Sequence, residues 1–415
     1  MQNFTGDYAG ATTSYLIALE IVRSVGKSVE TARASAEMMR CIGRVGERRG
    51  DYAEALRWLE NALKEIEPDP DPKSVERIRI FNDIGWVRLR LGEFEQAFEW
   101  AMRTLQIVEG TEYYNEMASV YNRLVALFRR KGDWERASAY AEKGLRLRER
   151  IGDLQGVSQS YNNMGTIEWE QGDWNSARLH LERSLDIRQK IGDIEGIARL
   201  NSNLCELYRE RGDYAHAIEL GGQALRIAEK IKQNNIVCFA LINLAHVKIL
   251  QDEFDTAVSH LTRCLALAGE MGSKERIAEA QWLLAEAYLG QNQFDQARQM
   301  AEQALALATE IGRRLIEGQV LRTLGRLALR QNDRTAAMDD LRRSIAVLGA
   351  SKNWFELAKS QYQLALVERD EGHRTDARAL LEQVLTTFTQ LGAEAERARA
   401  RAELDRIVEC SGQQL

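Results

Sequence analysis

Proline is almost missing from this chain of 415 residues. Only 3 prolines occur, all between Pro68 and Pro72, where an average sequence of this length would carry roughly 20. Because proline interrupts helices and central strands, its absence elsewhere leaves nearly the whole chain free to form helices. The proline segment itself forbids a helix, so we expect a loop over residues 67–73.

Cysteine and histidine are scarce as well, and their spacing excludes several kinds of site. The 5 cysteines include no CxxC pair, the 5 histidines form no HExxH motif, and no GxxxxGK loop occurs. Zinc and nucleotide sites depend on such spacings, and we therefore expect no metal and no cofactor. Scattered cysteines without a disulfide framework are typical of the reducing cytoplasm, which is the location we expect.

The chain has neither a basic excess nor a long apolar run. It carries 56 lysines and arginines against 62 acidic residues, for a net charge of -6, which argues against non-specific binding to nucleic acid. The basic cluster Arg129 to Lys131 is followed by Asp133 and Glu135, a pattern typical of a solvated helix end. No apolar run approaches the ~20 residues of a membrane-spanning helix, and we expect no membrane contact.

An internal repeat occupies almost the entire chain. The segments GDWERA at 132–137, GDWNSA at 172–177 and GDYAHA at 212–217 are copies of one unit. Glycine followed by an acidic residue ends one helix and begins the next, so each copy predicts an antiparallel helical hairpin. The last alanine of the unit recurs at spacings of 44, then 42, and then 40 residues seven times. Its positions are Ala11, Ala55, Ala97, Ala137, Ala177, Ala217, Ala257, Ala297, Ala337 and Ala377.

Three further columns of residues repeat together with that alanine. A mostly small residue lies twelve positions before it, as at Gly165, Cys205 and Gly325, and another lies seven positions after it. Small residues at these spacings let neighbouring helices approach closely. Three positions before the alanine lies an aromatic residue, which arginine replaces in the last two units. These residues are Tyr8, Tyr52, Phe94, Trp134, Trp174, Tyr214, Phe254, Phe294, Arg334 and Arg374.

This set of columns resembles the tetratricopeptide repeat (TPR), a helix-turn-helix solenoid unit. The resemblance covers nearly the whole chain. The period of 40 residues is similar to the longer-helix variety found in kinesin light chains, in the spindle adaptor Pins/LGN and in the sensor arms of bacterial MalT-like regulators. The resemblance implies an all-α, right-handed superhelical solenoid of about nine hairpins plus a half.

The repeat also predicts where helices and domains begin and end. The chain divides into an N-terminal half-hairpin at 1–27, a TPR array at 28–392, and a C-terminal capping helix and tail at 393–415, with the last helix spanning Glu394 to Glu409. A second helix follows each turn. We expect first helices at about 30–49, 74–91, 114–131, 154–171, 194–211, 234–251, 274–291, 314–331 and 354–371.

The repeat pattern predicts that the N-terminus begins in the middle of a hairpin. We expect Gly6 and Asp7 to form the turn of a hairpin whose first helix is absent, so only its second helix, from about Tyr8 to Val25, is expected. Either the chain is cut from a larger protein, which we favour, or this helix packs on a partner or a second copy. Exposed apolar side chains mark interfaces, and we expect self-association through Tyr8, Tyr15, Leu16 and Leu19.

The resemblance also implies where a ligand would bind. In TPR superhelices the first helices line a concave groove, and positions two and three before their small residue face it. Asn163, Asn203 and Asn243 occupy the first of these positions, and Asn82, Asn122 and Asn162 the second. A side-chain amide donates and accepts hydrogen bonds at once, so these residues suit the backbone of an extended peptide. The alternative is that they cap or cross-link neighbouring helices.

Arginine and tryptophan flank the asparagines, and both are enriched at interfaces. The lysine, arginine and asparagine spacing of chaperone-binding TPRs has no good match. The flanking residues that we expect to contact a ligand are Arg79, Trp86, Arg129, Trp169, Arg199, Arg209, Trp282, Arg322 and Arg326.

These features predict a non-catalytic scaffold that binds a protein or an extended peptide, in bacterial signalling. The sequence offers no constellation of acid, base and nucleophile for an enzyme. The alternative is the effector-sensing arm of a larger MalT-like transcription regulator or signal-transduction ATPase. Such an arm would bind a small molecule or a partner.

Overall fold

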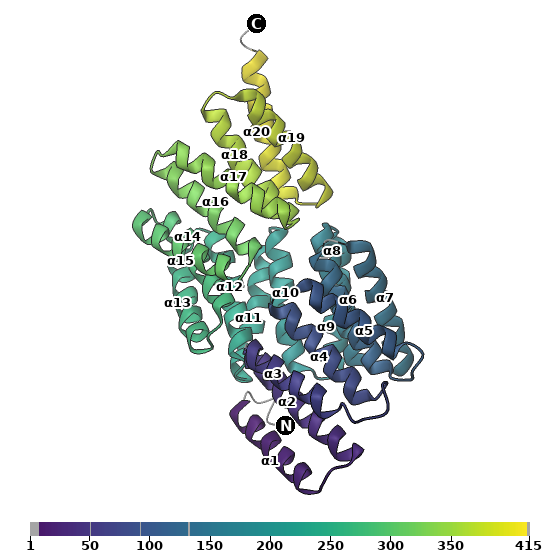
Figure 1. The fold of residues 1–415 in the computed structure, drawn as a ribbon. Coiled ribbons are helices and arrows are strands. Elements are labelled where there is room, and N and C mark those ends of the chain that lie inside the picture. Colours follow the sequence, from purple (N-terminus) through teal and green to yellow (C-terminus); the bar gives the residue numbers. More distant parts are fainter. Residues whose placement is uncertain (1–7, 50, 92, 132, 413–415) are drawn as a thin grey trace. The chain divides into compact units, whose positions relative to one another are not determined.

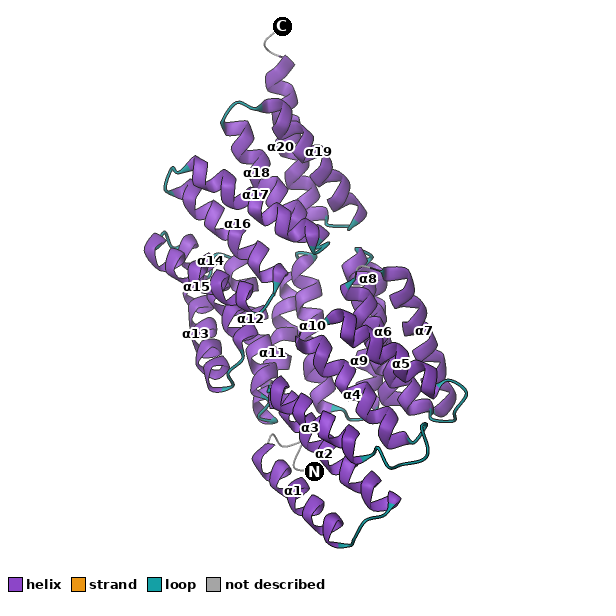
Figure 2. Cartoon of the chain, in the orientation of Figure 1, coloured by secondary structure: helices purple, strands orange, loops and turns teal. Residues whose placement is uncertain are grey.

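The computed structural model describes residues 8–49, 51–91, 93–131 and 133–412. Over these residues it contains 20 helices and no strand, as the all-α prediction requires (Figures 1 and 2). The first helix of each hairpin begins and ends within one residue of its expected position. The helices are α1 (Tyr8–Ser24), α2 (Val29–Arg49), α3 (Tyr52–Glu65), α4 (Val75–Leu91), α5 (Phe94–Val108), α6 (Tyr114–Arg130), α7 (Trp134–Ile151), α8 (Leu154–Gln171), α9 (Trp174–Lys190), α10 (Ile194–Glu210), α11 (Tyr214–Lys230), α12 (Asn234–Leu250), α13 (Phe254–Glu270), α14 (Lys274–Gly290), α15 (Phe294–Glu310), α16 (Arg314–Arg330), α17 (Arg334–Ala350), α18 (Trp354–Asp370), α19 (Arg374–Gln390) and α20 (Glu394–Gly412).

The hairpins form because the turn residues end and start helices in a short space. The Asp133 carboxylate accepts a hydrogen bond from the backbone N–H of Arg136 at the start of α7, and Asp213 caps α11 in the same way. In eight hairpins the first helix packs on the second; these first helices are α2, α4, α6, α10, α12, α14, α16 and α18. In addition, α10, α12, α14 and α16 each contact the next first helix of unit 2, as α2 and α4 do in unit 1. Within each unit, the side chains between successive first helices therefore form one face.

Contact between the paired helices depends on the small residues predicted from the repeat. Gly43, Gly85, Gly165 and Gly325 are all buried. A Cβ atom added to Gly325 would lie 2.8 Å from Cγ of Leu341 and 3.1 Å from the carbonyl oxygen of Ala337. The small column is thus required by the close approach of the two helices. Arg334, which replaces the aromatic residue, is exposed.

The proline segment is a loop, as expected, and two arginines anchor it. Arg33 Nε and Nη2 donate to the two carboxylate oxygens of Asp69 at 2.9 and 2.8 Å. These hydrogen bonds hold the pKa of the buried Asp69 carboxyl well below its usual range. Arg77 donates to the carbonyl oxygens of Ile66 and Asp69. The loop is therefore tied to both α2 and α4.

The described part of α1 corrects one expectation about the N-terminal helix. Leu19 is only 4% exposed because it packs with buried residues of α2 such as Ala36 and Met39. The exposed apolar residues are instead Leu16 at 39%, Ile17 at 54% and Ile21 at 61%. The expected turn at Gly6 and Asp7 lies outside the described residues. Self-association through α1 stays a prediction. Because Ile17 and Ile21 are the exposed apolar residues, substitutions that test it should be made at these two positions.

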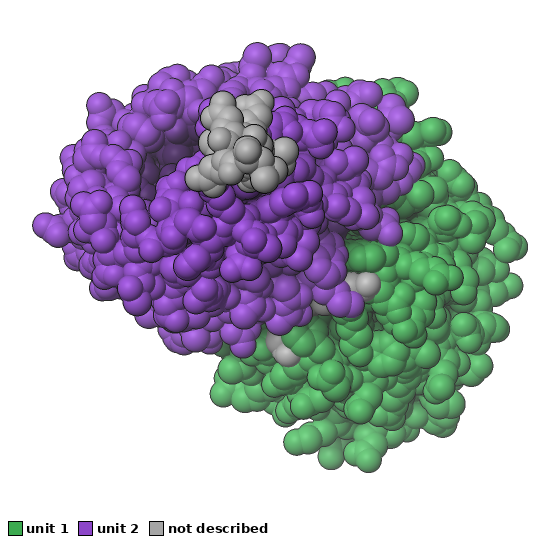
Figure 3. Space-filling view, turned by 90° about the horizontal axis from the view of Figure 1, so that it is seen from above, with its two compact units in different colours: residues 1–167, 183–192 green, residues 168–182, 193–415 purple. Residues whose placement is uncertain are grey.

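Contacts divide the chain into two compact units, coloured separately in Figure 3. Unit 1 comprises residues 1–167 and 183–192, and unit 2 comprises residues 168–182 and 193–415. In unit 1, buried residues of α4, α5, α6 and α7 form one apolar cluster. In unit 2, a cluster runs through α12 to α16 and includes Leu241, Leu261 and Leu283, all fully buried. At the end of unit 2, α20 buries Ala400 and Leu404 and extends past the expected Glu409.

Candidate functional site

The predicted asparagines of unit 1 connect successive first helices. Asn82 Nδ2 donates to Ser119 Oγ at 2.7 Å, and its carbonyl oxygen accepts from Arg123 Nε. Asn122 Oδ1 accepts from Asn163 Nδ2 at 3.1 Å and from an arginine of α7 at 3.0 Å. These amides therefore join α4 to α6 and α6 to α8. Asn122, Asn162 and Asn163 all remain partly exposed.

In unit 2 the predicted asparagines differ in burial. Asn243 is 2% exposed. Its Oδ1 atom accepts from Arg209 Nη1 at 3.2 Å, and its Nδ2 atom donates to the carbonyl oxygen of Ser202 at 3.1 Å. The structure thus uses Asn243 as a link between α10 and α12, which is the cross-linking alternative. Asn203 is half-buried, and its ligand role stays a prediction.

A group of charged residues surrounds Trp86 on the same face of unit 1. Asp83 accepts hydrogen bonds from Arg40 Nη1 at 2.7 Å and from Arg123 Nη2 at 3.1 Å. The Arg123 guanidinium lies 5.1 Å from the centre of the Trp86 ring, and Trp86 Nε1 donates to Glu47 at 2.8 Å. Burial lowers the pKa of Arg123 to about 10. This part of the face therefore combines an aromatic ring with paired charges of both signs.

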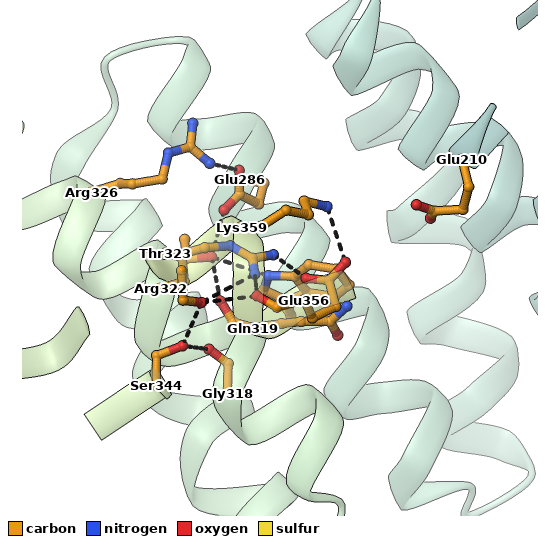
Figure 4. A network of polar contacts seen from close by, with 12 residues as sticks. Glu210, Glu286, Gly318, Gln319, Arg322, Thr323, Arg326, Ser344, Glu356 and Lys359 are labelled. Atoms are coloured by element: carbon orange, nitrogen blue, oxygen red, sulfur yellow. Dashed lines mark hydrogen bonds and ion pairs between the residues drawn. The ribbon is translucent and has the colours of Figure 1, made fainter. Parts of the chain in front are cut away.

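Unit 2 holds a second charged network on α16 and α18, shown in Figure 4. Arg322, which is 6% exposed, forms an ion pair with Glu356 and donates to its backbone carbonyl oxygen at 3.1 Å. Lys359 Nζ donates to Glu356 Oε1 at 3.0 Å. Burial opposes the charge of Glu356, but Arg322 and Lys359 outweigh it and hold the pKa of its carboxyl well below the usual range. The predicted Arg322 is thus an internal ion-pair partner.

A neighbouring set of contacts ties α14 to α16. Trp282, which is 7% exposed, donates from Nε1 to Thr323 Oγ1 at 3.0 Å. Thr323 donates to Glu286, and Glu286 pairs with Arg326. The Arg326 side chain is still 40% exposed, so it is the member of this set that a ligand can reach.

Glu206 on α10 carries a carboxyl group whose pKa is shifted towards neutrality. Its carboxylate lies 3.6 Å from Arg209, which makes a shorter ion pair of 2.6 Å with Glu210. Burial raises the pKa of Glu206 to about 7, and the nearby carboxylates of Glu210 and Glu279 add to the shift. Its side chain is nevertheless 32% exposed.

The remaining predicted residues occupy varied positions. Arg79 pairs with Glu116 at 2.8 Å, and both line a hollow of about 610 Å³ in unit 1. Arg199 is exposed and pairs with Glu195 at 2.8 Å. Trp169 and Arg129 are half-buried.

Sequence reasoning missed several residues of these networks. Asp83, Arg123 and Thr323 each lie two positions before the small residue of their repeat, the position that Asn163, Asn203 and Asn243 hold elsewhere. The column was therefore visible in the sequence. Its members were overlooked because they are not asparagines.

Metal binding and membrane spanning find no support among the described residues. None of their His, Cys, Asp and Glu side chains form a group of three or more that is placed to hold a metal ion. Each helix in the described ranges is too short or too polar to cross a bilayer.

Comparisons with known proteins agree on the architecture. The sequence model of the tetratricopeptide repeat matches residues 34–110, 116–190, 196–270 and 276–350. No curated protein matches the chain significantly.

Several solved structures are similar in fold. A plasmid Rap conjugation gene regulator in complex with a Phr peptide has a TM-score of 0.55 and 13% identity, over 68% of this chain and 76% of that one. Aspartyl phosphate phosphatase F from Bacillus subtilis has a TM-score of 0.55 and 12% identity, over 85% and 93%. A signal transduction ATPase with a tetratricopeptide repeat sensor from Pyrococcus horikoshii has a TM-score of 0.50 and 15% identity, over 87% and 54%. At these identities the likeness shows the fold alone.

Proposed function

Because the chain belongs to the tetratricopeptide repeat family, we propose that it is a non-catalytic scaffold that binds a protein or an extended peptide. The ligand would lie along the face that the first helices form within a unit, in a bacterial cytoplasm and in signalling. The observation that carries this proposal is that partly exposed polar side chains recur on the first helices at the repeat spacing. Asn122, Asn162 and Asn163 do so in unit 1, and Asn203 does so in unit 2.

The contacts suggest a division of labour among the predicted residues. Asn243 and Arg322 are buried, and their polar atoms form hydrogen bonds with neighbouring helices. We therefore assign both residues to the scaffold. Asn163 and Asn203 are half-buried, and Arg326 keeps an exposed guanidinium. We assign each of these three side chains to ligand contacts within its own unit, the amides to a peptide backbone and the arginine to an acidic group.

The similar structures support a peptide as the ligand class. The Rap regulator is described in complex with a peptide, and it shares the fold of this chain. One neighbour is named a phosphatase. We nevertheless propose binding alone, because Asp83, Glu286 and Glu356 are each engaged in ion pairs with arginine.

The test is a selection followed by a matched set of variants. Binders would be selected from a random peptide display library, and the best peptide titrated against the wild type, Asn163→Ala, Asn203→Ala and Asn243→Ala. Each half-buried amide is expected to contribute about 1 kcal/mol to binding, so Asn163→Ala and Asn203→Ala should each weaken binding about fivefold. Asn243→Ala should lower the melting temperature more than either of them does, because its amide is buried. Unchanged affinity in both exposed variants, or a library without binders, would refute the proposal.

The second candidate is the effector-sensing arm of a larger regulator. The fold shared with the sensor of the signal transduction ATPase favours it. Such an arm would bind a small molecule, so a thermal-shift screen of metabolites separates the two candidates. A shift with a small molecule, together with no selected peptide, would favour the sensor.

A further inference from the structure

Two segments of unit 2 that lie far apart in the sequence are in contact. Trp174, at the start of α9, meets Phe355, at the start of α18, with ring centres 5.5 Å apart and planes at 78°. Phe355 in turn meets Phe388 near the end of α19, with ring centres 5.9 Å apart. Repeats of a solenoid ordinarily contact only their neighbours, so this contact is additional to the repeat packing.

The burial of Trp174 reflects this extra contact. The aromatic residues at the same position in six other repeats are half-buried, although the next hairpin contacts some of them, as Arg90 contacts Tyr52 and Arg330 contacts Phe294. They are Tyr52, Phe94, Trp134, Tyr214, Phe254 and Phe294. Trp174 is only 6% exposed, and it has the additional contact with Phe355 of α18.

Gly172, in the turn before α9, supports the same conclusion independently. It has a φ of +91°, and a Cβ atom there would lie 2.7 Å from Cα of Leu391, in the turn between α19 and α20. The equivalent turn glycines Gly212 and Gly372 have no atom within 4 Å of such a Cβ. Other repeats place asparagine at this turn position with positive φ, as at Asn292. Of the three turns at Gly172, Gly212 and Gly372, the one at Gly172 therefore needs glycine for close approach.

We propose that Gly172, Trp174, Phe355, Phe388 and Leu391 form a clasp that closes unit 2 around its ligand-binding face and opens to admit the ligand. This inference rests on the proposed function and specifies its regulation. With the clasp closed, helices from α9 to α18 form a continuous circuit, because α10 also contacts α9 through Tyr208 and Glu182, 3.0 Å apart. The surface of unit 2 is hollowed in the view of Figure 3.

The clasp and the charged network share one helix. Phe355 immediately precedes Glu356, the partner of Arg322, and Lys359 Nζ lies 5.1 Å from the centre of the Phe355 ring. Any movement of α18 that separates Phe355 from Trp174 therefore also displaces Glu356 and Lys359. The affinity of a ligand that contacts Glu356 or Lys359 therefore depends on whether the clasp is open.

The first measurement needs no ligand. Gly172→Asn inserts a side chain into the clasp, whereas Gly212→Asn makes the same change in an uncovered turn. Amide hydrogen exchange by mass spectrometry should accelerate at residues 352–358 and 388–392 in Gly172→Asn by about two- to tenfold, the loss expected for an aromatic contact. Gly212→Asn should change exchange near its own turn only. If both variants leave residues 352–358 unchanged, the clasp does not exist.

The second measurement tests gating. Phe355→Ala opens the clasp without changing a turn, and Trp354→Ala removes a neighbouring ring that is 43% exposed. The selected peptide should associate with Gly172→Asn and Phe355→Ala about two- to tenfold faster than with the wild type or Trp354→Ala. Unchanged association rates in variants whose exchange has accelerated would overturn the gate while leaving peptide binding intact. A wild type that binds no peptide would instead overturn the proposed function.

Discussion

On the first helices, the pKa of a carboxyl group depends on its neighbours more than on the residue type. Glu356 and Glu206 lie on the same face of unit 2, yet the pKa of one is lowered and the pKa of the other raised. Glu356 has Arg322 and Lys359 as direct partners. The arginine nearest to Glu206 is already paired with Glu210. The difference therefore follows from how many cations each carboxylate can reach.

This difference predicts a pH dependence of stability. Because the pKa of Glu206 is about 7 in the folded chain and about 4.3 when unfolded, the favourable contribution of its protonated form is complete below pH ~4.3 and is lost as the pH rises through about 7. Glu206→Gln removes the ionised carboxylate. Its melting temperature should therefore exceed that of the wild type at pH 8, and the difference should shrink towards pH 5.

Glu356→Gln provides a control in which the expected change in melting temperature has the opposite sign. The lowered pKa of Glu356 means that its stabilising charge is present throughout pH 5 to 8 and is lost only in stronger acid. Its replacement should lower the melting temperature at every pH in this range. Thermal melts followed by circular dichroism measure both variants. A difference for Glu206→Gln that is constant with pH would show that burial does not shift its titration.

At the scale of elements, the stability of a hairpin depends on how closely its two helices approach. Gly325 and Gly269 are both helical glycines. The space around Gly325 is filled by Leu341 and Ala337, whereas no atom lies within 4 Å of a Cβ placed on Gly269. The same substitution should therefore have different consequences at the two positions.

Gly325→Ala should destabilise the chain by about 1–3 kcal/mol, the usual cost of overpacking. Gly269→Ala should be neutral or stabilising, by up to about 1 kcal/mol, because alanine restricts the unfolded chain and favours the helix. Urea titration followed by circular dichroism compares them. Equal effects at the two sites would contradict the close approach of α16 and α17.

Across the whole molecule, stability should vary with the number of packed neighbours. In unit 2, α14 packs against α12, α13, α15 and α16, whereas α20 packs mainly on α19; in unit 1, α1 packs mainly on α2. Because local opening is easiest where few contacts must break, we expect the slowest amide exchange in α12, α14 and α16. The fastest exchange among the helices should occur in α1 and α20. Exchange in α1 as slow as in α14 would indicate that another surface covers it.

The amino-acid sequence by itself determined the helices, their pairing and the positions that need small residues. These features depend on residues within one or two repeats, and a period of 40 residues displays them many times over. Gly43, Gly165 and Gly325 are buried where the columns predicted. The face that the first helices share was predictable for the same reason.

Only the tertiary structure decided how deeply residues of the same column are buried. Asn243 and Asn203 occupy the same column, yet Asn243 is 2% exposed while Asn203 is half-buried. The contact between Trp174 and Phe355 was equally invisible in the sequence. Each repeat encodes its packing on its neighbours, whereas contacts between distant repeats depend on small rotations that add up along the solenoid, and no single repeat specifies their sum.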